Sequence, residues 1–153
     1  MRTRGKDASS AWRNLSSLLS ARTMSQLPLP EWAPHQAVWI GFPSAADLWE
    51  DDLAPAQAEV AAFAAVVHAD GAGERVWLVA ADDTAAAEAH RLAPFAEVIV
   101  EPFGDIWLRD TGAIVTGSGP ERSAQGFGFN GWGAKYDLPD DDSIGERLAI
   151  RAQ

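Results

Sequence analysis

The sequence predicts an α/β protein in which short buried strands alternate with helices. Apolar runs rich in β-branched residues lie at 36–43, 75–81 and 97–102. Alanine-rich segments with helical spacing of their larger apolar residues separate these runs. The 153 residues, 47% of them apolar, are enough for one domain with a core.

The first predicted strand lies within QAVWIGFP, from Gln36, and stops at Pro43. A polar loop leads to Pro55, which suits the first position of a helix. In that helix one buried face is expected, and Gly71 should end the helix. The residues predicted to form the face are Val60, Phe63, Ala64 and Val67.

The next elements follow the same alternation. RVWLVAA is a buried strand, DDTAAAEAHRLAP a helix with Asp and Thr caps that stops at Pro94, and EVIVEP a third strand. Trp39 and Trp77, on the first two strands, are expected in the core.

The last third of the chain predicts a hairpin and a helix. AIVTG and AQGFGFNGWG should pair across the turn SGPERS, and DDDSIGERLAIRAQ should begin a helix at an Asp cap. Hairpins and crossovers together predict mixed strand pairing with helices outside. The final helix is cut off at Gln153, which indicates an incomplete structural unit.

The first 23 residues differ in composition from the rest. Residues 1–23 hold five basic residues and one acid, whereas residues 24–153 hold seven basic and 21 acidic ones. We interpret 1–23 as an N-terminal extension outside the fold, either a start assigned too early, with Met24 the true beginning, or a targeting segment. Residues 24–153 form the expected domain.

Charge and composition exclude several classes of function. A net charge of −10 disfavours nucleic acid as a partner and favours a small cation. No apolar run approaches the ~20 residues of a membrane span. The chain has no Cys, which excludes disulfides and thiolate metal sites in these residues. The acidic run Asp137–Asp142 lacks the spacing of a calcium loop and is interpreted as a helix N-cap.

The segment DIWLRD places charges between two apolar strands. In an extended chain Asp105, Trp107 and Arg109 would share one face, and Asp110 would point to the other. A carboxylate there must be paired or must face a cavity. A structural ion pair of Arg109 with either Asp, and a cation site with Trp107 as its wall, explain the pattern equally well.

Three motifs follow one another along the chain: EWAPHQAVWIGFP, WLRDTGAIV and FGFNGWGAKY. Together they resemble the agmatine deiminase family, which is related to bacterial-type peptidylarginine deiminases. WLRDTGAIV is similar to that family's W-x-R-D-T-G-P-x-F/V, EWAPHQAVWIGFP to its N-terminal stretch, and FGFNGWGAKY to F-N-A-W-G-G-K-Y. The departures are Phe42, Ala113, Gly131 and Ala134, of which the last is expected to alter a tight turn.

The resemblance implies a pentein fold, a five-bladed α/β propeller, of which this chain would form the first blade and the start of the second. It implies hydrolysis of a guanidinium group by a Cys thiolate with a His as general acid and base, most simply agmatine to N-carbamoylputrescine and ammonia in putrescine synthesis. Peptidyl-arginine is the alternative substrate. No metal or organic cofactor is implied, the location would be cytoplasmic, and the full-length form could be a homo-oligomer.

By motif, Asp110 corresponds to the guanidinium-binding carboxylate and Trp107 to a substrate-pocket residue, while Asn130 and Trp132 are candidates to line the pocket. Arg109 is expected to brace the strand end. The nucleophile and the catalytic His lie downstream in the family, so no catalytic residue is assigned here and this chain alone is expected to be inactive. His35 should be structural, and His68 and His90 should face solvent or cap helices. A non-catalytic cation-binding domain and a gene remnant are the competing hypotheses.

Overall fold

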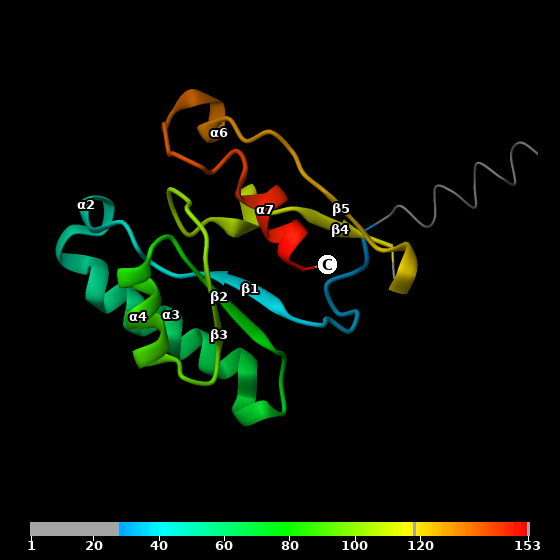
Figure 1. The fold of residues 1–153 in the computed structure, drawn as a ribbon, viewed down its shortest axis with the longest axis horizontal. Helices are drawn as coiled ribbons and strands as arrows, with labels where there is room; N and C mark the ends of the chain where they lie inside the picture. Colours follow the sequence, from blue (N-terminus) through cyan, green and yellow to red (C-terminus); the bar gives the residue numbers. More distant parts are fainter. Residues whose placement is uncertain (1–27, 118, 153) are drawn as a thin grey trace, which may run out of the picture.

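The computed structural model describes residues 28–117 and 119–152, so the predicted extension 1–23 and Met24 lie outside the described residues. Three parallel strands form one sheet in the order β1-β2-β3 (Figure 1). They are β1 (Val38–Gly41), β2 (Val76–Ala80) and β3 (Glu97–Val100). All three lie in predicted strand segments, because runs of apolar residues bounded by Pro or polar residues suit a sheet covered on both faces.

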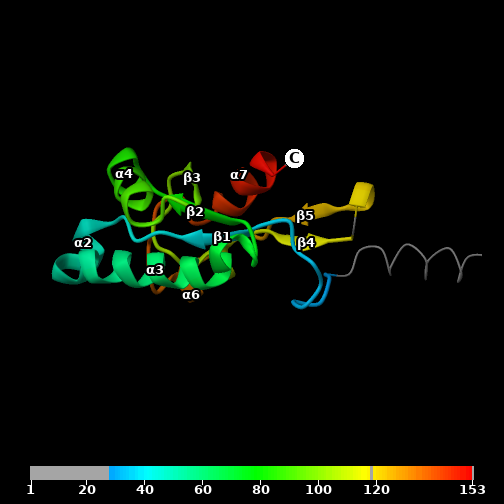
Figure 2. The same ribbon diagram turned by 90° about the horizontal axis from the view of Figure 1, so that it is seen from below.

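Helices α3 (Leu53–His68) and α4 (Asp83–Leu92) connect the strands and cover one face of the sheet. Figure 2 shows them at one end of the molecule. The predicted cap of α4 is confirmed, since the Asp82 carboxylate accepts a hydrogen bond from the Ala85 N–H at 2.8 Å. Core residues on this side include Phe42, Leu78 and small alanines of both helices.

The predicted buried face of α3 is partly wrong. Phe63 is 57% exposed, whereas Ala61 and Ala64 are buried, with Val60 and Val67 partly buried beside them. Because alanine side chains are small, they let α3 approach the sheet closely. The helix therefore contacts the sheet along a line of small residues. Gln57 is also buried on this line, because its side-chain amide donates to the Pro43 carbonyl at 2.9 Å.

The ends of α3 also differ from the prediction. The segment expected as a loop contains α2 (Ala46–Trp49) and η1 (Glu50–Asp52), and α3 begins at Leu53, so Pro55 is its third residue. Pro is tolerated there because the first turn has no intrahelical N–H partner to lose. The helix ends at His68, and η2 (Ala69–Gly71) follows.

Helix α7 (Ile144–Arg151) packs on the opposite face of the sheet. Ile144 and Leu148 join Val79, Ile99 and Phe103 in a second buried cluster. Trp39 and Trp77 lie beside this cluster, partly buried, with ring centroids 6.2 Å apart. Both tryptophans therefore pack against the core, as predicted, but at its margin.

The predicted hairpin is present and short. Strands β4 (Ile114–Thr116) and β5 (Ser123–Gln125) pair antiparallel, with η3 (Gly119–Glu121) between them. Within the described residues they form a sheet of their own, separate from the parallel one, so the two pairing types do not share a single sheet. The expected return strand ends at Gln125, and its remainder leads to the helical turn α6 (Gly131–Ala134).

Two local predictions in this half are wrong. The DIWLRD segment is not extended but ends in the helical turn α5 (Leu108–Thr111). The N-cap of α7 is Ser143, without a side-chain capping bond, and the acids before it do not cap the helix. In the part of the chain that the structure describes, no helix is long and apolar enough to span a membrane.

Candidate functional site

The α5 turn presents the W-L-R-D motif to solvent. The Thr111 N–H and hydroxyl both bond to the Trp107 carbonyl, at 3.0 and 3.1 Å, which fixes the turn internally. Trp107 is 49% exposed, and Asp110 is also exposed. The Asp110 carboxylate makes no hydrogen bond or ion pair with any other described residue. A helical turn therefore leaves both predicted recognition side chains available.

Arg109 forms an ion pair with a residue of the EWAPHQAVWIGFP motif. Its guanidinium donates to the carboxylate of Glu31, 78 positions earlier in the chain. The ion pair with Asp105 or Asp110, one of the two explanations of the pattern, is not formed: Arg109 pairs with Glu31, and Asp105 accepts from the Ile106 N–H at 2.7 Å. Arg109 thus links the motif to the N-terminal segment through a partner that local pattern could not identify, and its expected role of bracing a strand end stays a prediction.

Trp107 is one member of an aromatic cluster, which we define as Trp107, Phe129, Trp132 and Tyr136. The ring of Trp132 meets Trp107, Phe129 and Tyr136 edge to face, with centroids 6.5, 4.8 and 5.8 Å apart. These arrangements are favoured by the ring quadrupoles. The motifs WLRDTGAIV and FGFNGWGAKY therefore lie side by side, and the structure brings the candidates Trp107 and Trp132 together.

Asn130 stabilises the turn that carries Trp132. Its side-chain oxygen accepts from the Gly133 N–H at 2.9 Å and so caps α6. Gly131 has φ 62° and is buried, and an added Cβ would come within 1.9 Å of the Tyr136 carbonyl oxygen. The sharp turn that presents Trp132 depends on these two positions.

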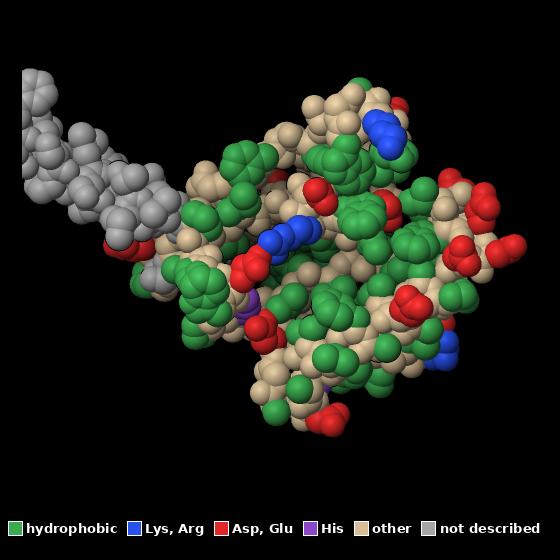
Figure 3. All heavy atoms as spheres, turned by 180° about the vertical axis from the view of Figure 1, so that it is seen from behind, with side chains coloured by type: hydrophobic (Ala, Val, Ile, Leu, Met, Phe, Trp, Pro, Cys, Tyr) green, Lys and Arg blue, Asp and Glu red, His purple; other side chains and the backbone are tan. Residues whose placement is uncertain are grey.

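The face shown in Figure 3 gathers hydrophobic side chains between acidic ones around a hollow, with few basic groups. Two open grooves are formed by described residues, one beside Arg75 and Phe95 and one between β5 and α7. Neither is lined by Trp107 or Asp110. The candidate site is an exposed edge that carries an aromatic wall and a carboxylate with no partner among the described residues.

The histidines take no part in this edge. His35 pairs with Glu74 at 3.1 Å, which agrees with the structural role expected of it. His68 stacks on Phe95 with centroids 4.8 Å apart and is only partly exposed, whereas His90 is exposed on α4. Among the residues that the structure describes, no group of His, Asp or Glu is arranged to hold a metal ion.

Sequence reasoning missed two acids that hold the motif loop in place. Asp141, predicted as part of a helix cap, is 1% exposed and accepts from the Gly104 N–H at 2.7 Å. Burial raises the pKa of the Asp141 carboxyl, while the nearby backbone N–H groups of Gly104 and Asp105 act in the opposite direction. No local signal identifies this partner, which lies 37 positions away.

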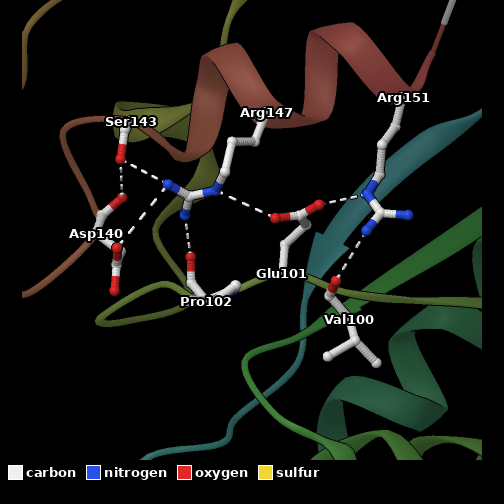
Figure 4. A network of polar contacts seen from close by, with 7 residues as sticks. All are labelled: Val100, Glu101, Pro102, Asp140, Ser143, Arg147 and Arg151. Carbon is white, nitrogen blue, oxygen red and sulfur yellow. Dashed lines mark hydrogen bonds and ion pairs between the residues drawn. The ribbon is translucent and has the colours of Figure 1, made fainter.

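Glu101 is the second of these acids and stands directly after β3. Figure 4 shows it between two arginines of α7: the Arg147 Nε lies 3.1 Å from one carboxylate oxygen, and the Arg151 Nε donates to the other. Arg147 also donates to the Pro102 carbonyl and, at 2.6 Å, to the Ser143 hydroxyl. This network fastens α7 to the end of the strand from which the motif loop departs.

Comparisons with known proteins show the family to which the sequence is similar. A family model described as Porphyromonas-type peptidyl-arginine deiminase matches residues 27–153. The agmatine deiminase of Stutzerimonas stutzeri is 36% identical over 126 residues, which cover 77% of this chain and 33% of that protein. The chain thus spans about a third of the length of this curated relative.

Solved structures show the same fold. The agmatine deiminase of C. jejuni matches with a TM-score of 0.65 and 24% identity, covering 79% of this chain and 36% of its own. Its substrate-bound form matches with a TM-score of 0.61 and 22% identity, covering 79% and 35%. The α/β arrangement described above is therefore the one found in agmatine deiminase structures. Because the family model extends over most of the chain and includes all three motifs, this chain belongs to the Porphyromonas-type peptidyl-arginine deiminase family.

Proposed function

We propose that this chain supplies the guanidinium-recognition edge of an agmatine deiminase, which converts agmatine and water to N-carbamoylputrescine and ammonia. The observation that carries the proposal is the combination of an exposed Asp110, which pairs with no other described residue, with the aromatic wall of Trp107 and Trp132. The curated relative at 36% identity is an agmatine deiminase, which favours agmatine as the substrate.

The chemistry of the edge suits a planar cation. A guanidinium presents forked N–H donors that match the two oxygens of a carboxylate, so Asp110 would orient the ligand. An aromatic face within reach adds roughly 0.5–2 kcal/mol of cation–π attraction. The acidic composition of the chain, with a net charge of −10, favours the approach of a cation over that of an anion.

In the complete enzyme this chain would bind the guanidinium group, and residues outside it would supply the nucleophile. None of the 153 residues is a Cys, so thiolate attack on the guanidinium carbon requires a nucleophile outside them. Residues 24–153 would form the first blade and the start of the second blade of a pentein propeller, with the pocket completed by later blades. The proposed setting is cytoplasmic putrescine synthesis, in which the full-length form acts without a metal or organic cofactor.

Peptidyl-arginine is a second candidate substrate, because the matching family model carries that description. It shares the guanidinium group with agmatine, and therefore the same recognition by Asp110. The two substrates differ in the group to which the guanidinium is attached: a short amine-terminated chain in agmatine, and a residue of a polypeptide in peptidyl-arginine. Comparing the two substrates in one assay separates these candidates.

The test measures ammonia release from agmatine by the complete product of the gene that encodes this chain, with the 153-residue chain in parallel. We expect turnover by a product that contains the downstream Cys and His, and none by the 153 residues alone. A complete product that ends at Gln153, or that releases no ammonia from either substrate, would leave only the non-catalytic cation-binding role. Turnover by the 153 residues alone would refute the assignment of the nucleophile to other residues.

A further inference from the structure

We propose that Asp141 is a positioning residue for the recognition edge, acting on Trp107 and Asp110 through the backbone of the loop that precedes them. The proposal deepens the function proposed above and rests on it. Asp141 touches neither side chain directly, and its effect would be transmitted through Gly104, three positions before Trp107.

The entry to the motif segment is held at two points. The Asp141 carboxylate accepts from the Gly104 N–H at 2.7 Å, and Leu138 packs so closely on Gly104 that an added Cβ there would lie 2.6 Å from the Leu138 Cβ. The turn before α7 thus contacts this loop shortly after the loop leaves β3.

The exit of the same segment rests on α7 itself. An added Cβ at Gly145 would lie 2.6 Å from the Thr111 carbonyl oxygen and 2.9 Å from the Ala113 nitrogen. Helix α7 and the turn before it therefore contact both ends of the segment that carries Trp107 and Asp110. Because the α5 turn is closed by its own hydrogen bonds, a shift at Gly104 would move it as a unit.

The platform on which Asp141 sits is fixed independently. Arg147 and Arg151 bind Glu101 at the end of β3 (Figure 4). Ile144 and Leu148 are fully buried against the sheet. Removal of the Asp141 side chain should therefore leave α7 in place. Its consequence should be confined to the loop.

Asp141 is an unfavourable choice for a purely structural role. One carboxylate oxygen, Oδ2, is buried without a hydrogen-bond partner among the described residues. Burying such a group costs free energy that an apolar side chain would not. Precise placement of the Gly104 backbone is what the carboxylate provides and an apolar residue would not.

The experiment compares Asp141→Ala and Asp141→Asn in the complete gene product, with the exposed neighbour as the matched control, Asp142→Ala. Asn keeps an oxygen that can accept from the Gly104 N–H, whereas Ala does not. We expect Asp141→Ala to raise the KM for agmatine about tenfold with a smaller change in kcat, the pattern of weakened substrate binding. Asp141→Asn and Asp142→Ala should keep the KM of the unsubstituted protein. Simple destabilisation would lower the amount of active enzyme and leave KM unchanged, so an unchanged KM in Asp141→Ala would overturn the proposal.

Amide hydrogen exchange in the same proteins supplies the second readout. Asp141→Ala should make exchange in 103–112 about tenfold faster, the effect of losing about one hydrogen bond, while exchange in β2 stays unchanged. Equal exchange in 103–112 in both variants would overturn the proposal without reference to activity. If the unsubstituted protein releases no ammonia from agmatine or peptidyl-arginine, the proposed hydrolase function has failed, and the exchange result alone then decides whether Asp141 positions the loop.

Discussion

The guanidinium of Arg109 is paired with the carboxylate of Glu31, so the motif at the end of β3 is tied to the segment that leads into β1. The two side chains are 84% and 73% exposed. Exposed ion pairs contribute roughly 0.2–1 kcal/mol to stability, because both charges remain hydrated. The pair therefore links the two motifs but contributes little to the stability of the fold.

A double-mutant cycle tests how much the ion pair of Glu31 and Arg109 contributes to stability. Glu31→Gln and Arg109→Gln, singly and together, should give a coupling energy below about 1 kcal/mol, and it should shrink when salt is raised. Thermal denaturation at low and high salt measures it. A coupling of several kcal/mol that salt does not change would show that the pair is buried in solution.

Glu101 should behave differently, since its carboxylate is only 11% exposed and binds two arginines. Glu101→Ala removes the carboxylate that Arg147 and Arg151 share, and we expect a loss of about 2 kcal/mol in the free energy of unfolding. Chemical denaturation measures the change.

Glu97→Ala is the matched control for Glu101→Ala. It removes the exposed partner of Arg75 and should cost less than about 1 kcal/mol. Equal losses at Glu97 and Glu101 would contradict the anchoring role of the Glu101 network.

The raised pKa of Asp141 makes stability depend on pH. Above the ordinary pKa of Asp the unfolded chain loses this proton while the folded chain still holds it, so stability falls as pH rises through that window. Asp141→Asn has no such proton. The free energy of unfolding of Asp141→Asn, relative to the unsubstituted protein, should therefore increase from about pH 3 to pH 6. A relative stability that stays constant across this range would contradict the burial argument.

Ala134 lies at φ 61°, where the family motif has Gly. A residue with a Cβ is strained in this left-handed region, so Ala134→Gly should stabilise the protein by about 1 kcal/mol in spite of the greater freedom of the unfolded chain. Thermal denaturation gives the change. Gly133→Ala, at φ 81°, is the opposite substitution and should destabilise; a gain in stability there would contradict the turn geometry.

The local sequence pattern is sufficient to predict an element where the signal lies within that segment. Apolar runs predict β1, β2 and β3, and the Asp82 cap predicts the start of α4, because both signals are contained in a few adjacent residues. The prediction of Phe63 as a core residue is wrong, because α3 packs on the sheet through its small alanine side chains and leaves the larger Phe63 side chain exposed.

The candidate site depends on contacts between distant segments. Local pattern does not predict the α5 turn, since Asp105, Arg109 and Asp110 show no strong helical or strand period. The partners of Arg109 and Asp141 lie 78 and 37 positions away, and only the fold brings them together. The resemblance of three motifs points to Trp107 and Asp110, and the structure adds the contact between Trp107 and Trp132.

The role of Asp110 is tested most directly by Asp110→Asn in the complete gene product, measured as kcat/KM for ammonia release from agmatine. Loss of the carboxylate charge should lower kcat/KM by at least about a hundredfold, the scale of a lost contact with a buried cation, with little change in thermal stability because Asp110 is exposed. Asp137→Asn, at another exposed acid, should leave activity unchanged. A folded Asp110→Asn protein with the kcat/KM of the unsubstituted protein would contradict the assignment of this edge to guanidinium recognition.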